Sequence, residues 1–349
     1  MCGLPKYNNN CLFSELAISN MNYDIIIDCT LFLIQGLVSM LFVNTSLVKE
    51  FILWGFPGVP IVQEVLFVIL LCTYILTLFT NSLVIMITLK ESKLQTPMYY
   101  FLRNFSLLEM CYVSVTVPKI LATISFQGRV ISISSCITQL FFFFFLSSTE
   151  CFLLGVMAFD RYLAVCHPLR YSSLMNHPTC QKLIICSWFG GFITTFPPIL
   201  LISQLEFCSS NVINHFFCDA PPLLQLSCRD ASFNEFLDFI CAAVVIMTSF
   251  TVTLMSYFYI IITVLKIPTK IGRRKVFSTC GSHLIVVLVY YSSVIFIYVR
   301  PKGGFTFSLN RTVAVFYTVL IPILNPIIYC LRNKEVKVAI KRLLSFQST

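Results

Sequence analysis

Apolar residues occur along this chain in long continuous runs that are separated by short polar segments. Each run is about 20 residues or longer and nearly free of charge, as expected for helices that cross a lipid bilayer. The runs do not show the two-residue alternation of membrane β-barrel strands. The pattern predicts an all-α membrane protein with seven spans, at residues 62–89, 97–122, 133–164, 183–203, 234–265, 275–299 and 308–330.

The third run continues into a polar segment that ends near Tyr171, and we expect the other spans to be organised around it. At about 1.5 Å per residue, a helix from Cys136 to Arg161 would be roughly 37 Å long. The hydrocarbon core of a bilayer is about 30 Å thick, so the two ends would emerge on opposite faces. One face would then present the Cys136 thiol, and the other face the acid–base pair of Asp160 and Arg161.

Composition excludes a soluble globular chain, because 57% of the residues are hydrophobic, 11% are charged and the mean hydropathy is +0.85. The net charge of +9 could suggest nucleic acid as a partner. The basic residues instead border the apolar runs, which favours charges in cytoplasmic loops. Most of the 16 cysteines lie within apolar runs, where free cysteine acts as a small hydrophobic residue, so only loop cysteines are expected to pair.

The distribution of basic residues predicts the side of the membrane on which each loop lies. With the N-terminus outside, sixteen of the 24 Lys and Arg residues fall on the cytoplasmic side, as the positive-inside rule requires. We therefore expect residues 1–61 to be extracellular, 62–330 to form the helix bundle, and 331–349 to form a cytoplasmic amphipathic helix and tail.

Residues 1–39 form an atypical extension of the predicted extracellular segment. Residues 25–43 are apolar apart from Asp28 and a few polar residues, so this run could be a signal-like or partly inserted segment. Alternatively, translation could start at Met40. Asn44 begins an Asn-Thr-Ser sequon just before the first span and is a predicted glycosylation site.

Several blocks of this sequence resemble, in order and in spacing, those of one receptor family. They are LQTPMYYFLRNFSLLE (94–109), MAFDRYLAVCHPLRY (157–171), HFFCDAPPLLQLSC (215–228), Ser256-Tyr257, RRKVFSTCGSH (273–283) and IPILNPIIYCLRN (321–333). The chain resembles the odorant (olfactory) receptors of the rhodopsin-like class A G-protein-coupled receptor family, in their tetrapod-type (class II) branch. It departs from the family pattern at Thr80, at Gln95 and at Tyr290-Tyr291-Ser292, where Gly, His and Phe-Tyr-Gly are usual.

The resemblance implies a rhodopsin-like bundle of seven transmembrane helices with a short C-terminal amphipathic helix. It also implies a non-enzymatic receptor in the cell membrane that binds small, mostly apolar volatile odorants. The expected partners are that odorant, membrane lipid and a stimulatory olfactory-type heterotrimeric G protein that raises cyclic AMP. Nucleic acid is not an expected partner.

Two disulfides are implied by the same resemblance. One joins Cys136, at the outer end of the third span, to Cys218 in the second extracellular loop, and the other joins Cys208 to Cys228 within that loop. The secretory route permits both bonds. The competing interpretation is a metal site that includes His215, Cys218 and Asp219, but its spacing is loose and it has no fourth ligand.

Two acidic residues, Glu109 and Glu150, are predicted at intramembrane depth, where an unpaired charge costs several kcal/mol. If both face the bundle interior, as the resemblance implies, they share a cation or one of them is protonated. Our hypothesis is a bound sodium ion, held together with Asn81 and Asn325. The alternative is two protonated acids that are hydrogen-bonded to neighbours.

An activation switch is implied at the inner face. Arg161 would pair with Asp160 in the closed bundle and meet a partner when the bundle opens, with tyrosines moving into the cleft. Pro326 removes a backbone donor and permits a bend in the seventh helix. The residues assigned to the switch are Asp160, Arg161, Tyr162, Tyr257, Tyr291, Asn325, Pro326 and Tyr329.

The ligand pocket is expected in the outer half of the bundle, between the third, fifth, sixth and seventh helices. A mostly apolar wall with a few hydroxyls suits a small, weakly polar ligand, whereas the alternative for each residue is ordinary helix packing. The predicted lining residues are Phe143, Phe144, Ser147, Ser148, Cys241, Val245, Val294, Ile295, Tyr298 and Thr318.

Two other classes of membrane protein are weaker interpretations of the sequence. A transporter or channel would be expected to have inverted repeats or helices broken at the midplane, and the sequence shows no repeat. A membrane enzyme would need a catalytic constellation, and none accompanies the buried acids.

Overall fold

The computed structural model describes residues 48–55, 60–125, 128–208, 210–298, 316–332 and 336–338. The chain divides into two compact units, Met1–Val43 and Asn44–Thr349, and every described residue belongs to the second. The predictions for residues 1–39, for Asn44 and for most of segment 331–349 lie outside the described residues.

Within the described residues, five helices are long and apolar enough to cross a membrane. Two further helices, α9 and α11, carry shorter apolar stretches at the predicted positions of the sixth and seventh spans. The apolar runs become helices because a backbone in lipid must satisfy its own hydrogen bonds. In chain order the helices are α2 (Pro60–Lys90), α3 (Pro97–Ile124), α4 (Ile133–Cys166), α6 (His177–Ser203), α8 (Ser232–Lys266), α9 (Lys270–Tyr298), the short π-helical segment η2 (Phe316–Leu320) and α11 (Ile321–Arg332).

Helix starts coincide with residues that suit them. Pro97 lies in the first turn of α3, where its missing N–H is not needed. The Ser132 hydroxyl accepts a hydrogen bond from the Ser135 N–H at the start of α4, and the Asn176 side chain does the same for Thr179 at the start of α6. These caps fix where the spans begin.

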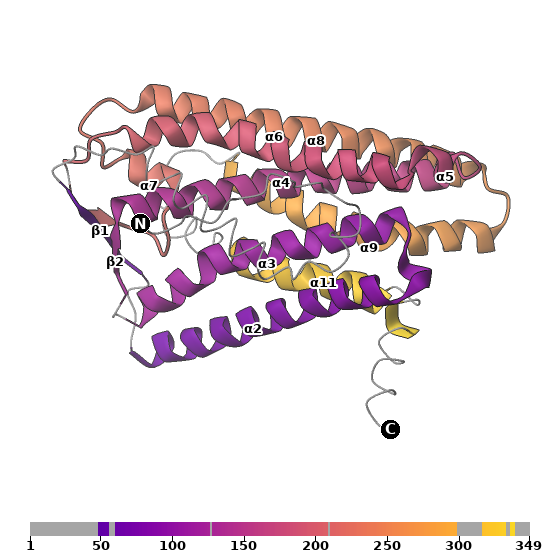
Figure 1. The fold of residues 1–349 in the computed structure, drawn as a ribbon, viewed down its shortest axis with the longest axis horizontal. Coiled ribbons are helices and arrows are strands. Elements are labelled where there is room, and N and C mark those ends of the chain that lie inside the picture. The colour runs from indigo at the N-terminus through magenta and orange to yellow at the C-terminus, as the bar shows by residue number, and fades with distance from the viewer. Residues whose placement is uncertain are drawn as a thin grey trace, which may run out of the picture. The chain divides into compact units, whose positions relative to one another are not determined.

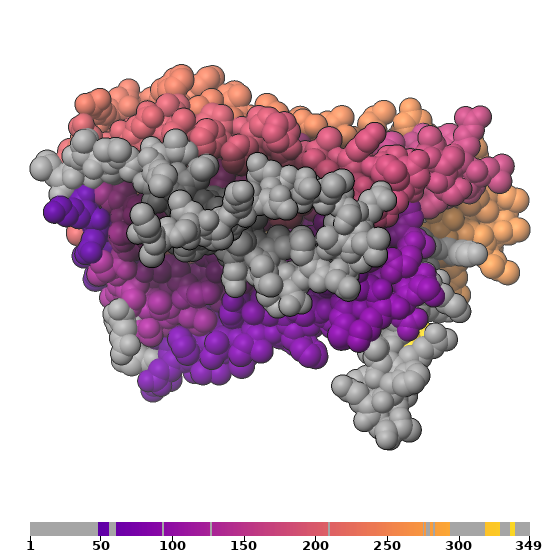
Figure 2. Space-filling model, viewed as in Figure 1, coloured from indigo at the N-terminus to yellow at the C-terminus, as the bar shows by residue number. Residues whose placement is uncertain are grey.

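Helix α4 is the central element of the bundle, with α3, α6, α8 and α9 packed around it (Figure 1). In its most apolar window, 67% of the residues are buried, compared with 17% for α2. Large apolar side chains such as Val65, Ile69 and Phe79 are exposed on α2, which runs along one edge in Figure 2. This exposed apolar face is suited to contact with lipid acyl chains.

A three-stranded sheet joins segments from different parts of the chain. Strand β1 (Glu50–Leu53) lies in the middle, antiparallel to β2 (Val130–Ser132) and parallel to β3 (Val212–Ile213). Phe51 and Leu53 are fully buried, and the Phe51 ring contacts Phe207 edge-on at 5.2 Å between centroids. The sheet therefore connects the segment before the first span to the loops that precede α4 and α8.

Three short helical turns lie in the described connections between spans. The 3-10 turn η1 (Ser92–Leu94) lies between α2 and α3, and α5 (Tyr171–Leu174) lies between α4 and α6. The turn α7 (Ala220–Leu224) belongs to the long loop before α8 and packs against α8. The long loop is thus placed directly beside the end of the bundle at which α8 begins.

Candidate functional site

A cavity of about 50 Å³ lies between the third, fourth, fifth and sixth spans, which are α4, α6, α8 and α9. Its wall is mostly apolar, with five hydroxyls and one carboxyl group. The lining residues are Phe144, Ser147, Ser148 and Cys151 of α4; Thr194, Thr195, Pro198 and Ile199 of α6; Asp238, Cys241, Ala242, Val245 and Ile246 of α8; and Tyr290 of α9.

Half of the predicted ligand-contacting residues line this cavity, namely Phe144, Ser147, Ser148, Cys241 and Val245. These residues come from α4 and α8, the third and fifth spans, which the sequence predicts to face each other across the pocket.

The remaining predicted pocket residues lie elsewhere or are not described at side-chain level. Phe143 does not line the cavity; its ring stacks on Tyr112 of α3 at 5.6 Å and packs against Phe217 of the long loop at 5.1 Å. Thr318 is fully buried but is not a lining residue. The side chains of Val294, Ile295 and Tyr298 lie outside the described residues.

The fourth span is the contribution that sequence reasoning missed. The expected walls were the third, fifth, sixth and seventh helices, whereas α6 supplies four lining residues in the described structure. No lining residue comes from the described part of the seventh span. The cavity thus extends to α6, a helix that the predicted pocket did not include.

Tyr290 joins α9 to α4 at the cavity. Its hydroxyl donates to the Ser147 carbonyl at 3.3 Å and lies 3.0 Å from the Cys151 sulfur. Tyr290 occupies one of the positions at which this sequence departs from the family pattern. The additional hydroxyl of this tyrosine therefore forms a direct polar contact between two spans.

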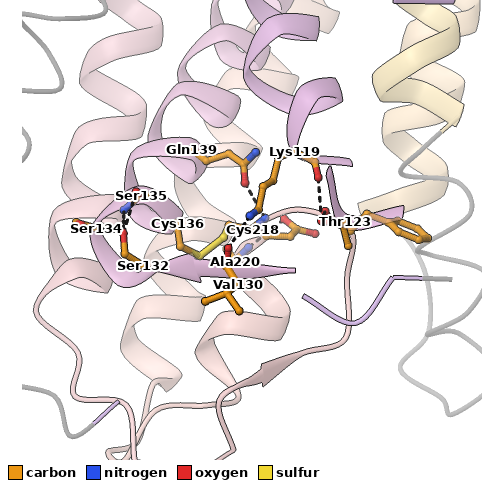
Figure 3. The surroundings of a disulfide bond; sticks show 12 residues. Lys119, Thr123, Val130, Ser132, Ser134, Ser135, Cys136, Gln139, Cys218 and Ala220 are labelled. Atoms are coloured by element: carbon orange, nitrogen blue, oxygen red, sulfur yellow. Dashed lines mark hydrogen bonds between the residues drawn. A yellow bond between two sulfur atoms is a disulfide. The ribbon is translucent and has the colours of Figure 1, made fainter. Parts of the chain in front are cut away.

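A disulfide between Cys136 and Cys218 ties the long loop to the first turn of α4, with 5.4 Å between the two Cα atoms (Figure 3). One turn further along α4, Gln139 accepts a hydrogen bond from the Cys218 N–H at 3.1 Å and donates to the Val115 carbonyl of α3 at 2.9 Å. Lys119 also holds the loop before α4, donating to the Gly128 and Val130 carbonyls at 2.7 and 2.8 Å. Gln139 therefore holds the long loop beside the disulfide, and Lys119 holds the loop that precedes α4.

A second disulfide, between Cys208 and Cys228, closes the long loop on itself. Both pairings are those that the resemblance implied. Cys218 is fully occupied by its disulfide, and the described residues contain no group of three metal-ligating side chains, so the alternative site that combines His215, Cys218 and Asp219 is not formed. The Asp219 carboxylate instead caps α7 by accepting a hydrogen bond from the Ala220 N–H at 3.0 Å.

The two intramembrane acids lie in the bundle interior. Glu109 of α3 is fully buried and accepts a hydrogen bond from the Asn325 side chain of α11. Glu150 of α4 is also buried. Glu109 Oε2 and Glu150 Oε1 are buried without a hydrogen-bond partner among the described residues.

Asn81 takes a different position from the one predicted for it. Its amide donates to the carbonyls of Thr77, at 3.0 Å, and of Pro322, at 3.4 Å. It therefore links α2 to α11, and its side-chain hydrogen bonds among the described residues go to these carbonyls rather than to the acids. Of the four residues predicted to hold a cation, Glu109 and Asn325 are in direct contact with each other.

The predicted acid–base pair is formed near the C-terminal end of α4. Arg161 donates to Asp160 through Nε at 3.1 Å and through a second, shorter hydrogen bond from Nη2. The other Asp160 oxygen accepts from the Tyr171 hydroxyl of α5 at 2.7 Å. Both charged side chains are buried. Tyr171 is a partner that sequence reasoning did not assign, although it lies at the end of a quoted motif.

Tyr257 of α8 lies near this pair and forms a hydrogen bond with a residue that the prediction omitted. Its hydroxyl is 2.8 Å from His283 Nδ1 of α9, and the two rings are stacked. His283 is fully buried. The sequence signal for this contact is a single histidine at the start of an apolar run, which suggests a buried polar partner.

The other predicted switch residues are placed as follows. The Tyr162 hydroxyl forms a hydrogen bond with His167 Nε2 at 3.0 Å. The Tyr291 ring packs edge-on against Phe250, and its hydroxyl has no hydrogen-bond partner in the described part of the chain. Pro326 lies within α11, and the Tyr329 side chain is outside the described residues.

Comparison with known proteins decides the family. The family model described as olfactory receptor matches residues 70–347. Mouse olfactory receptor 6B9 is 47% identical over 302 residues, which cover 86% of this chain and 96% of that protein. Human olfactory receptor 6C75 is 48% identical over 301 residues, which cover 86% and 96%. Human olfactory receptor 6B1 is 47% identical over 306 residues, which cover 88% and 98%.

The chain belongs to the olfactory receptor family. Membership confirms the resemblance and the predicted seven-transmembrane fold. This olfactory receptor is a multi-pass membrane protein that acts as an odorant receptor, couples to G proteins and is not an enzyme. The transporter and enzyme interpretations are therefore excluded.

Proposed function

We propose that this olfactory receptor binds small, mostly apolar volatile molecules in the cavity between α4, α6, α8 and α9. Binding activates a stimulatory, olfactory-type G protein and so raises cyclic AMP. The observation that carries the proposal is the cavity itself, whose apolar wall interrupted by hydroxyls is typical of a small-molecule site. Burial would supply about 25 cal/mol per Å² of apolar surface, and a hydroxyl would orient the ligand.

Helix α9 supplies a physical route from the cavity to the inner face. Tyr290 and His283 are seven residues apart, which places them two turns apart on the same side of α9. Tyr290 bonds to α4 at the cavity, and His283 bonds to Tyr257 near Arg161. A ligand that favours one position of Tyr290 would therefore also favour one arrangement of the inner contacts, provided that it binds the two arrangements with different affinity.

The proposed orientation puts the N-terminus and the disulfide-linked loop outside the cell. Residues 1–61 are then extracellular, and residues 331–349 lie on the cytoplasmic surface. This orientation is supported by the excess of basic residues in the loops assigned to the inside. The G protein would approach the face that carries Arg161 and the basic segment 266–275.

The proposal predicts that filling the cavity abolishes responses to odorants. Cells that carry the receptor and the olfactory-type G protein would be exposed to a broad panel of volatile apolar compounds, with cyclic AMP as the readout. For any active compound, Val245→Phe is expected to raise the half-maximal concentration tenfold or more, since the added ring occupies space that the ligand needs; this factor corresponds to about 1.4 kcal/mol.

The matched control is Val252→Phe, on an exposed face of the same helix, which is expected to leave the response unchanged. Equal responses from Val245→Phe and the wild type, at equal surface expression, would contradict the location of the site. A response through calcium without cyclic AMP would contradict the coupling.

The same proposal includes a sodium ion between Glu109 and Glu150. Two buried carboxylate oxygens without partners in the described residues suit a hard cation, which prefers oxygen ligands. The alternative is that both acids are protonated.

If sodium is bound, replacing it in the medium by N-methylglucamine is expected to change the half-maximal ligand concentration by about fivefold or more. The change should disappear in Glu109→Gln, whose amide removes the charge that attracts the ion. Cyclic AMP dose–response curves at several pH values provide the measurement. Wild-type curves that do not change with sodium or with pH would rule out the ion.

A further inference from the structure

One carboxyl group faces the ligand cavity, and it has no basic partner among the described residues. Asp238 lines the cavity on α8. The ion pairs within the described ranges are Asp160 with Arg161 and Glu206 with Arg229, and neither includes Asp238. A half-buried carboxylate in an otherwise apolar wall loses part of its hydration and gains little electrostatic stabilisation from its neighbours. Its natural complement is a cation or a strong hydrogen-bond donor.

The position of Asp238 on its helix places it in the cavity wall rather than on the lipid side. Cys241, Ala242 and Val245 follow at offsets of three, four and seven residues, which is one face of a helix. The intervening Phe239 is exposed on the outer face. Asp238 lies six residues from the start of α8, about 9 Å along the helix.

A second polar group in the same wall is unpaired. Thr195 of α6 is 3% exposed, and its hydroxyl has no hydrogen-bond partner among the described residues. Threonines in helices usually bond the carbonyl four residues back, as Thr194 does to Gly190 at 2.8 Å. Thr194 also approaches the Gly191 carbonyl, at 3.2 Å, which is the acceptor that Thr195 would use. A buried hydroxyl without a partner is costly, so Thr195 is suited to receive a polar group from a ligand.

The loop above the cavity reinforces the negative potential. Asp219 caps α7, which packs against α8, and its charge repels that of Asp238. Burial raises the pKa of Asp219 to about 6, so this carboxyl group is still largely ionised at neutral pH. Two negative groups near one cavity favour entry of a cation over that of a neutral or anionic molecule.

The volume of the cavity limits the size of the ligand. A water site needs about 10–15 Å³, so a cavity of about 50 Å³ holds only a few non-hydrogen atoms without rearrangement. The apolar side of the same cavity, formed by Phe144, Val245 and Ile246, suits a short hydrocarbon chain.

We propose that this cavity selects small primary amines, with the ammonium group paired to Asp238 and the Thr195 hydroxyl accepting a further hydrogen bond. The short hydrocarbon chain then packs against Phe144, Val245 and Ile246. This inference rests on the proposed function, because it names the ligand class of the same cavity.

The test uses the full-length receptor in cells with the olfactory-type G protein. Primary amines from propylamine to hexylamine are each compared with the alcohol of the same carbon skeleton. Amines are expected to be at least tenfold more potent than their alcohols. Asp238→Asn is expected to raise the half-maximal amine concentration about 10- to 100-fold, the range for losing a charged hydrogen bond, with little change for alcohols. Thr195→Val, which keeps the shape, is expected to raise it about threefold to tenfold.

Asp230→Asn is the matched control. Asp230 is an exposed carboxylate of the loop just before α8, outside the cavity, so its replacement should leave amine potency unchanged. Alcohols as potent as the amines, or an Asp238→Asn receptor at wild-type surface level with unchanged amine potency, would overturn the inference.

Binding without signalling separates this inference from the proposed function. The thermal unfolding midpoint of the purified receptor would be measured with each amine and each alcohol. A midpoint that rises with amines, and no longer rises in Asp238→Asn, supports the inference even if cyclic AMP stays flat, in which case only the coupling fails. Cyclic AMP responses to alcohols or esters, with neither response nor midpoint shift for any amine, overturn the inference and leave the proposed function standing.

Discussion

Replacing Cys218 by serine is expected to remove most of the receptor from the cell surface. Its disulfide with Cys136 joins positions 82 residues apart, and the chain-entropy relation assigns about 4–5 kcal/mol to a link of that length. Folded domains are stable by only about 5–15 kcal/mol. The freed loop would also lose the contact of Phe217 with Phe143 and the hydrogen bond from the Cys218 N–H to Gln139.

Two other cysteine variants serve as the control and as the intermediate case. Cys186→Ser removes an exposed, unpaired thiol of α6 and should leave surface expression unchanged. Cys208→Ser opens a link of 20 residues, for which the same relation gives about 3 kcal/mol, so an intermediate loss is expected. Surface labelling of intact cells by flow cytometry is the measurement. A Cys218→Ser receptor at wild-type surface level would show that the loop is held by its packing alone.

Arg161→Ala is expected to abolish the cyclic AMP response to every active ligand. The guanidinium is buried and forms two hydrogen bonds to Asp160. Its removal leaves a buried carboxylate with the Tyr171 hydroxyl as its remaining side-chain partner among the described residues. Loss of one member of a buried pair costs about 3–5 kcal/mol, which is enough to disturb the packing of this end of α4. The group proposed to meet the G protein is also lost.

Ligand binding should survive this substitution, because Arg161 lies ten residues beyond Cys151, the last α4 residue that lines the cavity, or about 15 Å along the helix. A ligand-dependent rise in the unfolding midpoint of Arg161→Ala, without cyclic AMP, is therefore the expected combination. Arg229→Ala breaks an exposed ion pair with Glu206 and should change neither quantity. A full response from Arg161→Ala at normal surface levels would contradict the role assigned to the pair.

The positions of the spans could be predicted from sequence because each span alone must satisfy its backbone in lipid. The length of an apolar run is then sufficient evidence, and α2, α3 and α4 begin and end within a few residues of the predicted bounds. The strands could not be predicted in this way. β3 is two residues long and β2 three, too short for any periodicity, and their pairing depends on segments far apart in the chain.

The cavity was predicted only in part because sequence does not fix the rotation of a uniformly apolar helix. Phe143 and Phe144 are adjacent and chemically identical, yet one packs against α3 and the other lines the cavity. Successive helical residues point about 100° apart, and a run of phenylalanines gives no sign of which one faces the ligand. The same ambiguity concealed Thr195, since the apolar residues around it do not indicate which side of α6 is inward.

The central position of β1 has a consequence for how the chain matures during synthesis. β1 is made before any span, but one neighbouring strand appears only after α3 and the other only after α6. In the proposed orientation, the nascent segment must therefore wait unpaired in the endoplasmic reticulum while two spans are inserted, and it gains its second neighbour only after four. Its apolar Phe51 and Leu53, buried in the finished sheet, remain accessible to chaperones throughout that delay. The sheet can be complete while α8, α9 and α11 are still to be made, so it can form before the whole bundle closes.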